Sequence, residues 1–430
     1  MPERRTLFEW AEIATTVGLI AMMSNALIGP LFDPNETGGD SIPILRLIWL
    51  PVYAATAILA AIRLPQMLRF WGPAMILLLL VGWAFASVLW SIDPSTTLRR
   101  SVALAATTLL GLYLAARYDG RELAEIVAWT FLILAFGSYF VCILVPSMGV
   151  HHGVNAGLWR GLWYEKNALG MMMVYGSLAA VAAAVTNPGR RIFWLACLIP
   201  FMGLIIMTHS ATSLLTLAIV LGGAMAFSLI SLGPVPAIGA IWLGVAGALA
   251  IGGFYAIAPD LFYAAIGKDP SLTGRTEIWQ AVLRAHDQAP TFGYGFAAFW
   301  GLQSPPAMWI RDQLQWLVPT AHNGWLDLLV QLGNVGVALF GTIFGLSALS
   351  GLARFQSLRD GYFSTLFLVV FGLQTLSESI ILAHNSLPWV FAVVAIARLL
   401  GPSPEPRVVT SPPPTQSWSL ATARQARQPA

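Results

Sequence analysis

One histidine, His322, stands where a long polar segment gives way to an apolar run, with Asn323 beside it and Asp327 just over one helical turn further on. At the N-terminus of a helix the macrodipole disfavours a charged imidazole, so this side chain would stay neutral and accept a proton. A neutral imidazole suits a general base acting on a hydroxyl group. The alternative is an interfacial histidine that caps the helix or reaches the lipid headgroups.

Several arginines are candidates for binding an anion on the face of the membrane where we place His322, which the orientation argued below makes the outer face. Arg275 and Arg284 lie in the polar segment, and Arg99 and Arg100 follow Asp93 in an earlier connection. A guanidinium binds phosphate through paired, charge-assisted hydrogen bonds, which suits a diphosphate. The alternatives are contact with lipid headgroups and, for Arg99 and Arg100, an ion pair with Asp93.

A further outer segment, residues 147–166, holds Arg160 and Lys166, which we predict to contact an anion or its sugar. His151 and His152 are adjacent, but no carboxylate or cysteine stands at metal-ligand spacing. No metal site and no cofactor are therefore predicted.

Glu378 is unusual because it falls inside an apolar run. A carboxylate within the membrane is expensive, and it marks either a functional site or the partner of a buried arginine, for which Arg46 is the candidate. His384 and Asn385 end the same run and form a second His-Asn pair on the outer face. We expect Glu378, His384 and Asn385, together with Asn323, to contribute to substrate binding.

These residues belong to a chain of 430 residues, of which 57% are hydrophobic and 10% charged. An ordinary soluble domain is roughly one quarter charged, so a soluble globular enzyme is excluded. The apolar residues form runs of about 20, the length at which a helix crosses a hydrocarbon core of ~30 Å. The sequence predicts an all-α polytopic membrane protein with about twelve transmembrane helices. The expected spans are 9–29, 42–62, 74–92, 101–117, 122–146, 167–185, 192–207, 212–231, 234–257, 325–352, 362–384 and 386–400.

The distribution of arginines predicts the orientation of these spans. With a cytoplasmic N-terminus, both termini lie inside by the positive-inside rule. Each short inner loop then holds a pair of arginines: Arg63 and Arg69, Arg117 and Arg121, Arg190 and Arg191, Arg354 and Arg359. Arginines on the outer face run against this rule and need another reason, such as anion binding. Nucleic acid is not expected as a partner, because the arginines are spread over loops.

A single transmembrane domain is expected over residues 1–400, followed by a proline-rich, disordered cytoplasmic tail at 401–430. The outer connection between the ninth and tenth spans, about 258–324, is far longer than the others, and such loops usually carry function. Within it, residues 274–286 predict an amphipathic helix lying on the membrane surface. Several tryptophans outside the spans offer faces on which sugars stack: Trp159, Trp163, Trp300, Trp309 and Trp316.

With these residues in place, nearly the whole chain resembles the O-antigen ligase and polymerase superfamily, polytopic proteins that move glycans from undecaprenyl-diphosphate carriers. The most specific motifs are Gly274-Arg275-Thr276-Glu277-Ile278-Trp279, residues 290–295, His322-Asn323-Gly324-Trp325-Leu326, Gln331-Leu332-Gly333-Asn334-Val335-Gly336, and Leu89-Trp90-Ser91-Ile92-Asp93-Pro94 with Arg99. The run Glu165-Lys166-Asn167 after Trp159-Arg160-Gly161, with Glu378 and Asn385, resembles the exopolysaccharide polymerases more than the lipopolysaccharide ligases. The ligases commonly show additional outer arginines, whereas Arg311 is the only later candidate in this long loop.

The resemblance implies a metal-independent, inverting glycosyltransferase of the GT-C type on the periplasmic side of the bacterial inner membrane. Arg275, with Arg99, Arg100 and Arg160, would hold the diphosphate of the donor lipid, and His322 would deprotonate the attacking sugar hydroxyl. Attack at the anomeric carbon would displace undecaprenyl diphosphate. The implied partners are undecaprenyl-diphosphate-linked oligosaccharide, membrane lipids and other polysaccharide-export or chain-length proteins.

Three functions fit these features. A polymerase would join lipid-linked repeat units into an exopolysaccharide, capsule or O-antigen-like glycan. A ligase would use the same residues to transfer a finished glycan to lipid A core or to protein. A flippase for lipid-linked sugars also fits twelve spans, but transporters are typically built from inverted repeats with polar residues at the midplane. No paired halves are evident in this sequence, so the polymerase is the leading hypothesis.

Overall fold

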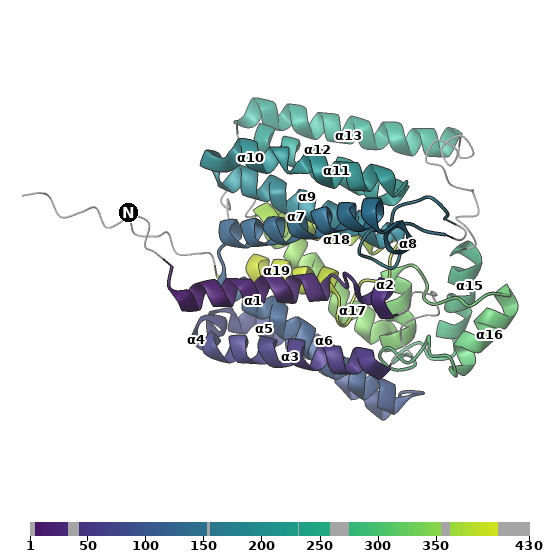
Figure 1. Cartoon of the computed structure of the whole chain (residues 1–430). Coiled ribbons are helices and arrows are strands. Elements are labelled where there is room, and N and C mark those ends of the chain that lie inside the picture. The colour runs from purple at the N-terminus through teal and green to yellow at the C-terminus, as the bar shows by residue number, and fades with distance from the viewer. Residues whose placement is uncertain are drawn as a thin grey trace, which may run out of the picture.

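The computed structural model describes residues 5–32, 43–152, 155–230, 232–258, 275–353 and 362–402. Within these ranges most helices run roughly parallel through one bundle (Figure 1). Six helical stretches are long and apolar enough to cross a membrane, and shorter apolar helices accompany them. The six are Leu64–Leu89, Gly120–Leu144, Lys166–Thr186, Pro188–Met207, Ala211–Ile230 and Gly324–Ala353. The prediction of an all-helical, polytopic membrane protein is confirmed.

Helices occupy each of the twelve predicted apolar runs. Those before residue 150 are α1 (Leu7–Met23), α2 (Ile28–Phe32), α3 (Pro43–Ile62), α4 (Leu64–Met67), η2 (Leu68–Phe70), α5 (Trp71–Ala86), η3 (Ser87–Leu89), α6 (Pro94–Arg117), α7 (Gly120–Leu144) and α8 (Pro146–Gly149). Those after it are α9 (Lys166–Thr186), η4 (Pro188–Arg190), α10 (Arg191–Ala196), α11 (Leu198–Met207), α12 (Ala211–Ile230), α13 (Pro234–Ile257), α15 (Arg275–His286), α16 (Pro305–Leu314), α17 (Gly324–Ala353), α18 (Tyr362–Gln374) and α19 (Leu387–Leu400).

Two helices, α9 and α19, form the centre of the bundle. Nearly every residue of α19 is buried, and α9 is buried along most of its length. Small residues permit the close packing: a Cβ at Gly111 of α6 would stand 2.6 Å from Val393 of α19, and one at Gly176 of α9 would stand 2.8 Å from Phe131 of α7. Helices in lipid associate through such small-residue contacts, because lipid supplies little hydrophobic driving force between them.

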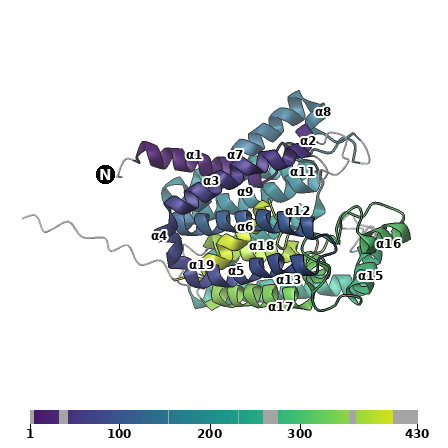
Figure 2. The same ribbon diagram turned by 90° about the horizontal axis from the view of Figure 1, so that it is seen from below.

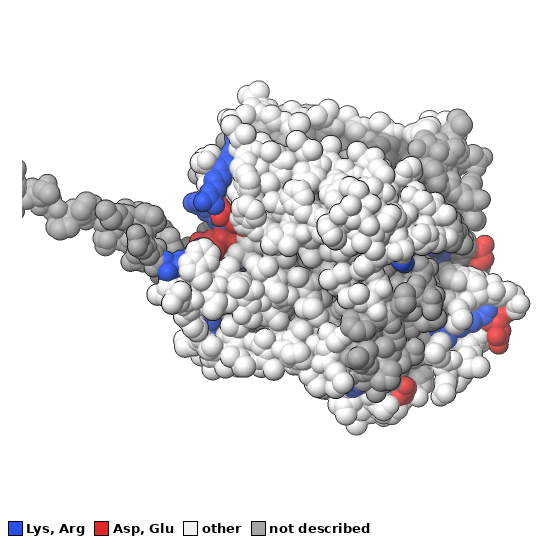
Figure 3. All heavy atoms as spheres, in the orientation of Figure 1, with Lys and Arg blue, Asp and Glu red and all other residues white. Residues whose placement is uncertain are grey.

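Charged side chains gather at the two ends of the bundle and leave a band without Lys, Arg, Asp or Glu between them (Figure 3). At one end, α15 and α16 project beyond the other helices, as the second view also shows (Figure 2). We call this the outer end, in keeping with the predicted orientation. The start of α1 and the end of α19 both lie at the opposite, inner end, where Arg5 pairs with Glu122 and Arg398 donates to Tyr118 O.

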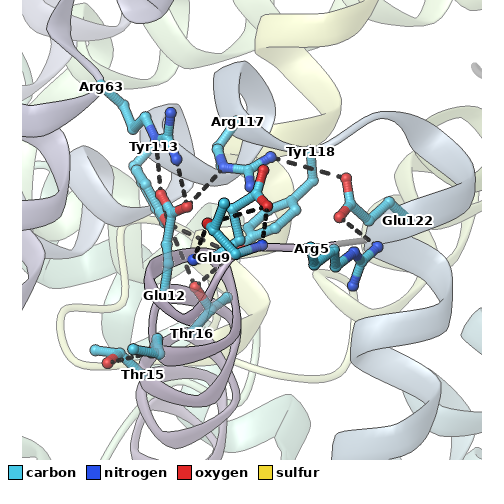
Figure 4. Close-up of polar contacts among 12 residues, drawn as sticks. Arg5, Glu9, Glu12, Thr15, Thr16, Arg63, Tyr113, Arg117, Tyr118 and Glu122 are labelled. Atoms are coloured by element: carbon cyan, nitrogen blue, oxygen red, sulfur yellow. Dashed lines mark hydrogen bonds and ion pairs between the residues drawn. The ribbon is translucent and has the colours of Figure 1, made fainter. Parts of the chain in front are cut away.

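A buried acid organises the inner end (Figure 4). Glu12 of α1 is 2% exposed and accepts hydrogen bonds from Arg63 Nε at 2.7 Å and from Arg117 Nε at 2.9 Å. Tyr113 OH also donates to it, at 3.1 Å. This network joins α1 to α6 and to the turn after α3.

The eleventh predicted span, 362–384, is shorter than expected, whereas α19 matches the last one. Helix α18 ends at Gln374 rather than near residue 384, and residues 375–386 form a largely non-helical connection to α19. Helices of 13 and 14 residues extend only about 20 Å, less than the ~30 Å hydrocarbon core. An irregular backbone is tolerated at this depth because other parts of the protein bind its polar groups. Thr375 O, for example, accepts from Gly324 N at 2.8 Å.

The expectation for residues 274–286 is half right. Helix α15 forms as predicted, but its apolar face is covered by protein and does not lie on a membrane surface. Ile278, Ala281, Val282 and Ala285 are buried in a separate core within the outer part of the molecule. The other members of that core are Phe299, Ile310, Val318, Ala321 and Val330. Residues 259–274 and the predicted tail from 403 onward lie outside the described residues.

Candidate functional site

The turn before α17 places His322 on the outer part of the molecule. Asn323 begins the helix, because its side-chain oxygen accepts from Trp325 N at 3.0 Å and from Leu326 N at 3.2 Å. These bonds satisfy two amides that a helix start leaves without partners. His322 itself has a left-handed backbone with φ 48°, which is uncommon outside glycine. The predicted position at a helix N-terminus is thus what the structure shows.

Arg275 and His322 lie close enough to influence each other. Burial, reinforced by the positive charge of Arg275, lowers the pKa of His322 below its ordinary range. Arg275 is held at the start of α15, where its Nη1 donates to Ser377 O in the 375–386 connection at 3.2 Å. The imidazole is therefore neutral at neutral pH, as a general base must be. The cause differs from the one expected: burial and a neighbouring cation are the forces that act on it.

Hydrogen bonds to backbone carbonyls join the early outer connection to the long one. Trp90 Nε1 donates to Phe292 O at 3.0 Å, and Ile92 N donates to Tyr294 O at 3.1 Å. Glycines make this contact possible. Gly295 has φ 100°, and a Cβ there would stand 2.7 Å from Ser91 Cα. The motifs at 89–94 and 290–295 therefore meet in space.

The same contact places the arginines at the start of α6. Arg100 is half-buried, and its Nη1 donates to Ala297 O at 3.4 Å. Arg99 is exposed and donates to Thr96 Oγ1 at 3.1 Å. Asp93 accepts from Thr96 N at 3.0 Å, so it caps α6.

The connection at 375–386 carries three more predicted residues. Glu378 was predicted to lie inside a membrane-spanning helix. The structure places it after α18, which ends at Gln374, so that prediction is wrong. The ring of His384 lies 6.4 Å from that of Phe296. Asn385 accepts from Tyr53 OH at 2.7 Å through Oδ1. The side chain of Arg46 lies outside the described part of the chain, so its pairing with Glu378 stays a prediction.

Asn385 and Asn323 both have their side-chain oxygens engaged within the protein. The backbone N–H of Asn385 also donates to Thr107 Oγ1 at 2.9 Å, and its backbone carbonyl accepts from Asn25 Nδ2 at 3.0 Å. Asn385 thereby joins the end of α1 to the middle of α3 and of α6, so it lies deeper in the bundle than the outer face on which it was predicted. These contacts favour a packing role for both asparagines.

The remaining candidates are Arg284, Arg160 and Lys166. Arg284 is exposed nine residues after Arg275 on α15, which puts it on the opposite side of that helix. Arg160 is buried, and its Nε donates to Met148 O at 3.0 Å within its own loop. The backbone amide of Lys166 donates to His151 Nε2 at 3.2 Å at the start of α9.

Two further residues organise the outer part and were not among the predicted site residues. Asp327 Oδ1 accepts from Trp300 Nε1 at 2.6 Å and from Ala321 N at 3.1 Å. Arg311 donates to three carbonyls, those of Trp300, Gly301 and Val318. An acid in the first turn of an apolar helix was the available signal for Asp327, whereas nothing in the sequence marks a guanidinium that binds carbonyls.

Within the described residues, no three His, Cys, Asp or Glu side chains group closely enough to hold a metal ion. The outer end instead offers cations and one neutral histidine. Such a set can bind a phosphorylated ligand and accept a proton from a hydroxyl group.

Comparison with known proteins agrees with this arrangement. A family model described as O-Antigen ligase matches residues 192–341, which include Arg275 and His322. With the multi-pass helical fold, this match confirms the resemblance of the chain to the O-antigen ligase and polymerase superfamily.

The chain is also similar to a particular curated relative. It is 28% identical over 300 residues to the Exopolysaccharide production protein ExoQ of Rhizobium meliloti (strain 1021). The aligned residues make up 64% of this chain and 66% of that protein, so the similarity leaves about a third of each outside.

Proposed function

We propose that this protein polymerises undecaprenyl-diphosphate-linked oligosaccharide repeat units at the periplasmic face of the bacterial inner membrane, giving an exopolysaccharide, capsule or O-antigen-like glycan. The observation that carries the proposal is a half-buried His322 at the start of α17, with Arg275 at the start of α15 near enough for its charge to lower the pKa of the imidazole. Similarity to an exopolysaccharide production protein favours polymerisation as the outcome.

In the proposed reaction, His322 takes the proton from an acceptor sugar hydroxyl as that oxygen attacks the anomeric carbon of the donor sugar. The bond from this carbon to the diphosphate breaks, its electron pair leaves with undecaprenyl diphosphate, and the configuration inverts. Arg275 binds the diphosphate where negative charge develops, and Arg100 and Arg99 approach it from α6. The proton then passes from His322 to solvent.

The test is reconstitution of the purified protein with an undecaprenyl-diphosphate-linked oligosaccharide in the presence of a chelator, with products sized by gel or mass spectrometry. A ladder of repeat multiples is expected from the wild type, and His322→Ala should lose at least about a hundredfold in rate, the lower range for a general base. His209→Ala is the matched control, because His209 is also left-handed and lies, exposed, between α11 and α12. Full activity of His322→Ala would remove this residue from the mechanism.

A ligase is the second candidate, because the matching family is described as O-Antigen ligase. It would give no ladder, and transfer would occur only when a lipid A core or protein acceptor is added. Failure with every acceptor would favour transport of the lipid-linked sugar instead.

A further inference from the structure

The backbone of His322 needs support from its surroundings. A left-handed conformation in a residue with a side chain carries strain of about 1–2 kcal/mol and persists where neighbouring contacts enforce it. If the loop relaxed, the imidazole would leave its place beside Arg275.

Hydrogen bonds hold Ala321, the residue before His322, through both its N–H and its carbonyl group. Ala321 N donates to Asp327 Oδ1 at 3.1 Å, and Ala321 O accepts from Trp279 Nε1 at 2.9 Å. The amide of His322 donates to Thr320 Oγ1 at 3.3 Å. Ala321 itself is fully buried, so water cannot replace these partners.

Asp327 connects this turn to the rest of the outer part. Its side chain is 4% exposed, and the same Oδ1 accepts from Trp300 Nε1 at 2.6 Å. The main chain of Trp300 is in turn bound by Arg311 Nη2 at 2.7 Å. One buried carboxylate thus ties the His322 turn, the loop at 300–301 and α16 to the first turn of α17.

We propose that Asp327 is a positioning residue, which acts through the Ala321 amide to hold the left-handed turn and so to aim the His322 imidazole at the reacting hydroxyl. The proposal rests on the proposed function. Asp327 would act on the backbone of His322, and its loss should therefore affect the chemical step more than donor binding.

Asp327→Ala removes the acceptor for both donors. We expect kcat to fall by about 10- to 100-fold, the loss typical when a reacting group is displaced by about an ångström, with KM for the lipid-linked donor unchanged. Asp327→Asn should rescue most of the rate, because an amide oxygen can accept from both Trp300 and Ala321 in the same place.

A double variant separates positioning from general structural support. If Asp327 acts only through His322, then His322→Ala/Asp327→Ala will have the same residual rate as His322→Ala alone. Additive losses would overturn the proposal, as would full activity of Asp327→Ala. If Asp327→Ala does not accumulate as folded protein, Asp327→Asn is measured in its place. A fall in the rate of Asp327→Asn as large as that of His322→Ala would contradict positioning by hydrogen bonds. Full activity of His322→Ala would instead refute the proposed function.

Discussion

His322 and Arg275 come from different elements, and Arg275 has two effects in the outer part of the molecule. The guanidinium binds a carbonyl of the 375–386 connection and also lowers the pKa of the imidazole. A lowered pKa extends the neutral, proton-accepting form to more acidic solution. The acidic limb of a pH–rate profile should therefore lie below pH ~6.5, the ordinary histidine value.

Arg275→Gln should move that limb to higher pH. Removal of the positive charge removes one of the two causes that lower the pKa of His322, so the imidazole becomes protonated at a higher pH. Arg275→Lys is the matched control, because it keeps the charge and loses the two-pronged guanidinium. It should weaken donor binding without moving the limb. The measurement is kcat/KM against pH, which reports the pKa of His322 in the free enzyme. An identical acidic limb in Arg275→Gln would show that Arg275 does not influence the protonation of His322.

Asn323 and Asn385 show that the residue type alone does not determine the role of a side chain. Asn323 and Asn385 each follow a histidine at the outer end of an apolar run, and the sequence predicts the same binding role for both. In the structure one caps α17 and the other joins α1, α3 and α6. An amide beside a helix start has several possible partners, and only the tertiary contacts select among them.

The early and long outer connections form one unit through their glycines. Gly295 lies against Ser91, and Gly333, with φ 66°, lies against Thr291. Side chains larger than hydrogen have no room at either position. This close approach is what brings the start of α6 to the outer loop that carries Phe296 and Ala297.

Gly295→Ala should therefore separate the two connections. A Cβ would stand 2.3 Å from Ser91 Oγ, and the residue would also keep a positive φ, which alone costs about 1–3 kcal/mol. We expect lower thermal stability and lower activity in detergent. Gly301→Ala is the control in the same loop, because its nearest neighbour is Ala298 O at 3.3 Å. Equal thermal stability and equal activity of the two variants would show that close contact between the two connections is not required for either property.

The sequence predicted the helices well and the connections poorly. Runs of about 20 apolar residues located α7, α9 and α12 within a few residues, whereas α6 begins at Pro94, before the predicted start at residue 101. Hydropathy gave the wrong end for α18, because an apolar segment buried in protein resembles a helix in composition. Periodicity likewise predicted α15, yet it could not say whether lipid or protein covers the apolar face. Pairings between distant segments, such as Ala321 with Asp327 and Trp300, depend on tertiary packing.

Across the whole molecule, the arginines that suggest the orientation also stabilise the inner end. Arg63 and Arg117 bind the buried Glu12, while Arg121 and Arg190 approach Glu125 at 3.7 Å and 4.0 Å. The positive-inside pattern is thus partly a set of internal ion pairs. The two roles are compatible, since neither requires the charge to leave the inner end.

Glu12→Ala should destabilise the protein without changing the outer site. Two half-buried arginines would lose their shared buried partner, and the cost should approach about 3–5 kcal/mol, the value typical of breaking a fully buried pair. Thermal unfolding in detergent should show a large fall in Tm, while the specific activity of the remaining folded protein stays near wild type. Glu9→Ala is the control, since Glu9 only caps the start of α1. An unchanged Tm for Glu12→Ala would mean that the network adds no net stability.

The joins at the outer end also have a consequence for the order of biosynthesis. Trp90 and Phe292, which bind each other, are 202 residues apart, and the partners of Arg275 and Asn385 come from both ends of the chain. Translation and membrane insertion proceed from the N-terminus. A nascent chain that has reached α13 carries Arg100 but not yet Ala297, whose carbonyl accepts a hydrogen bond from that arginine. The outer site therefore assembles only after α17 and the 375–386 connection have emerged, when insertion of the protein is nearly complete.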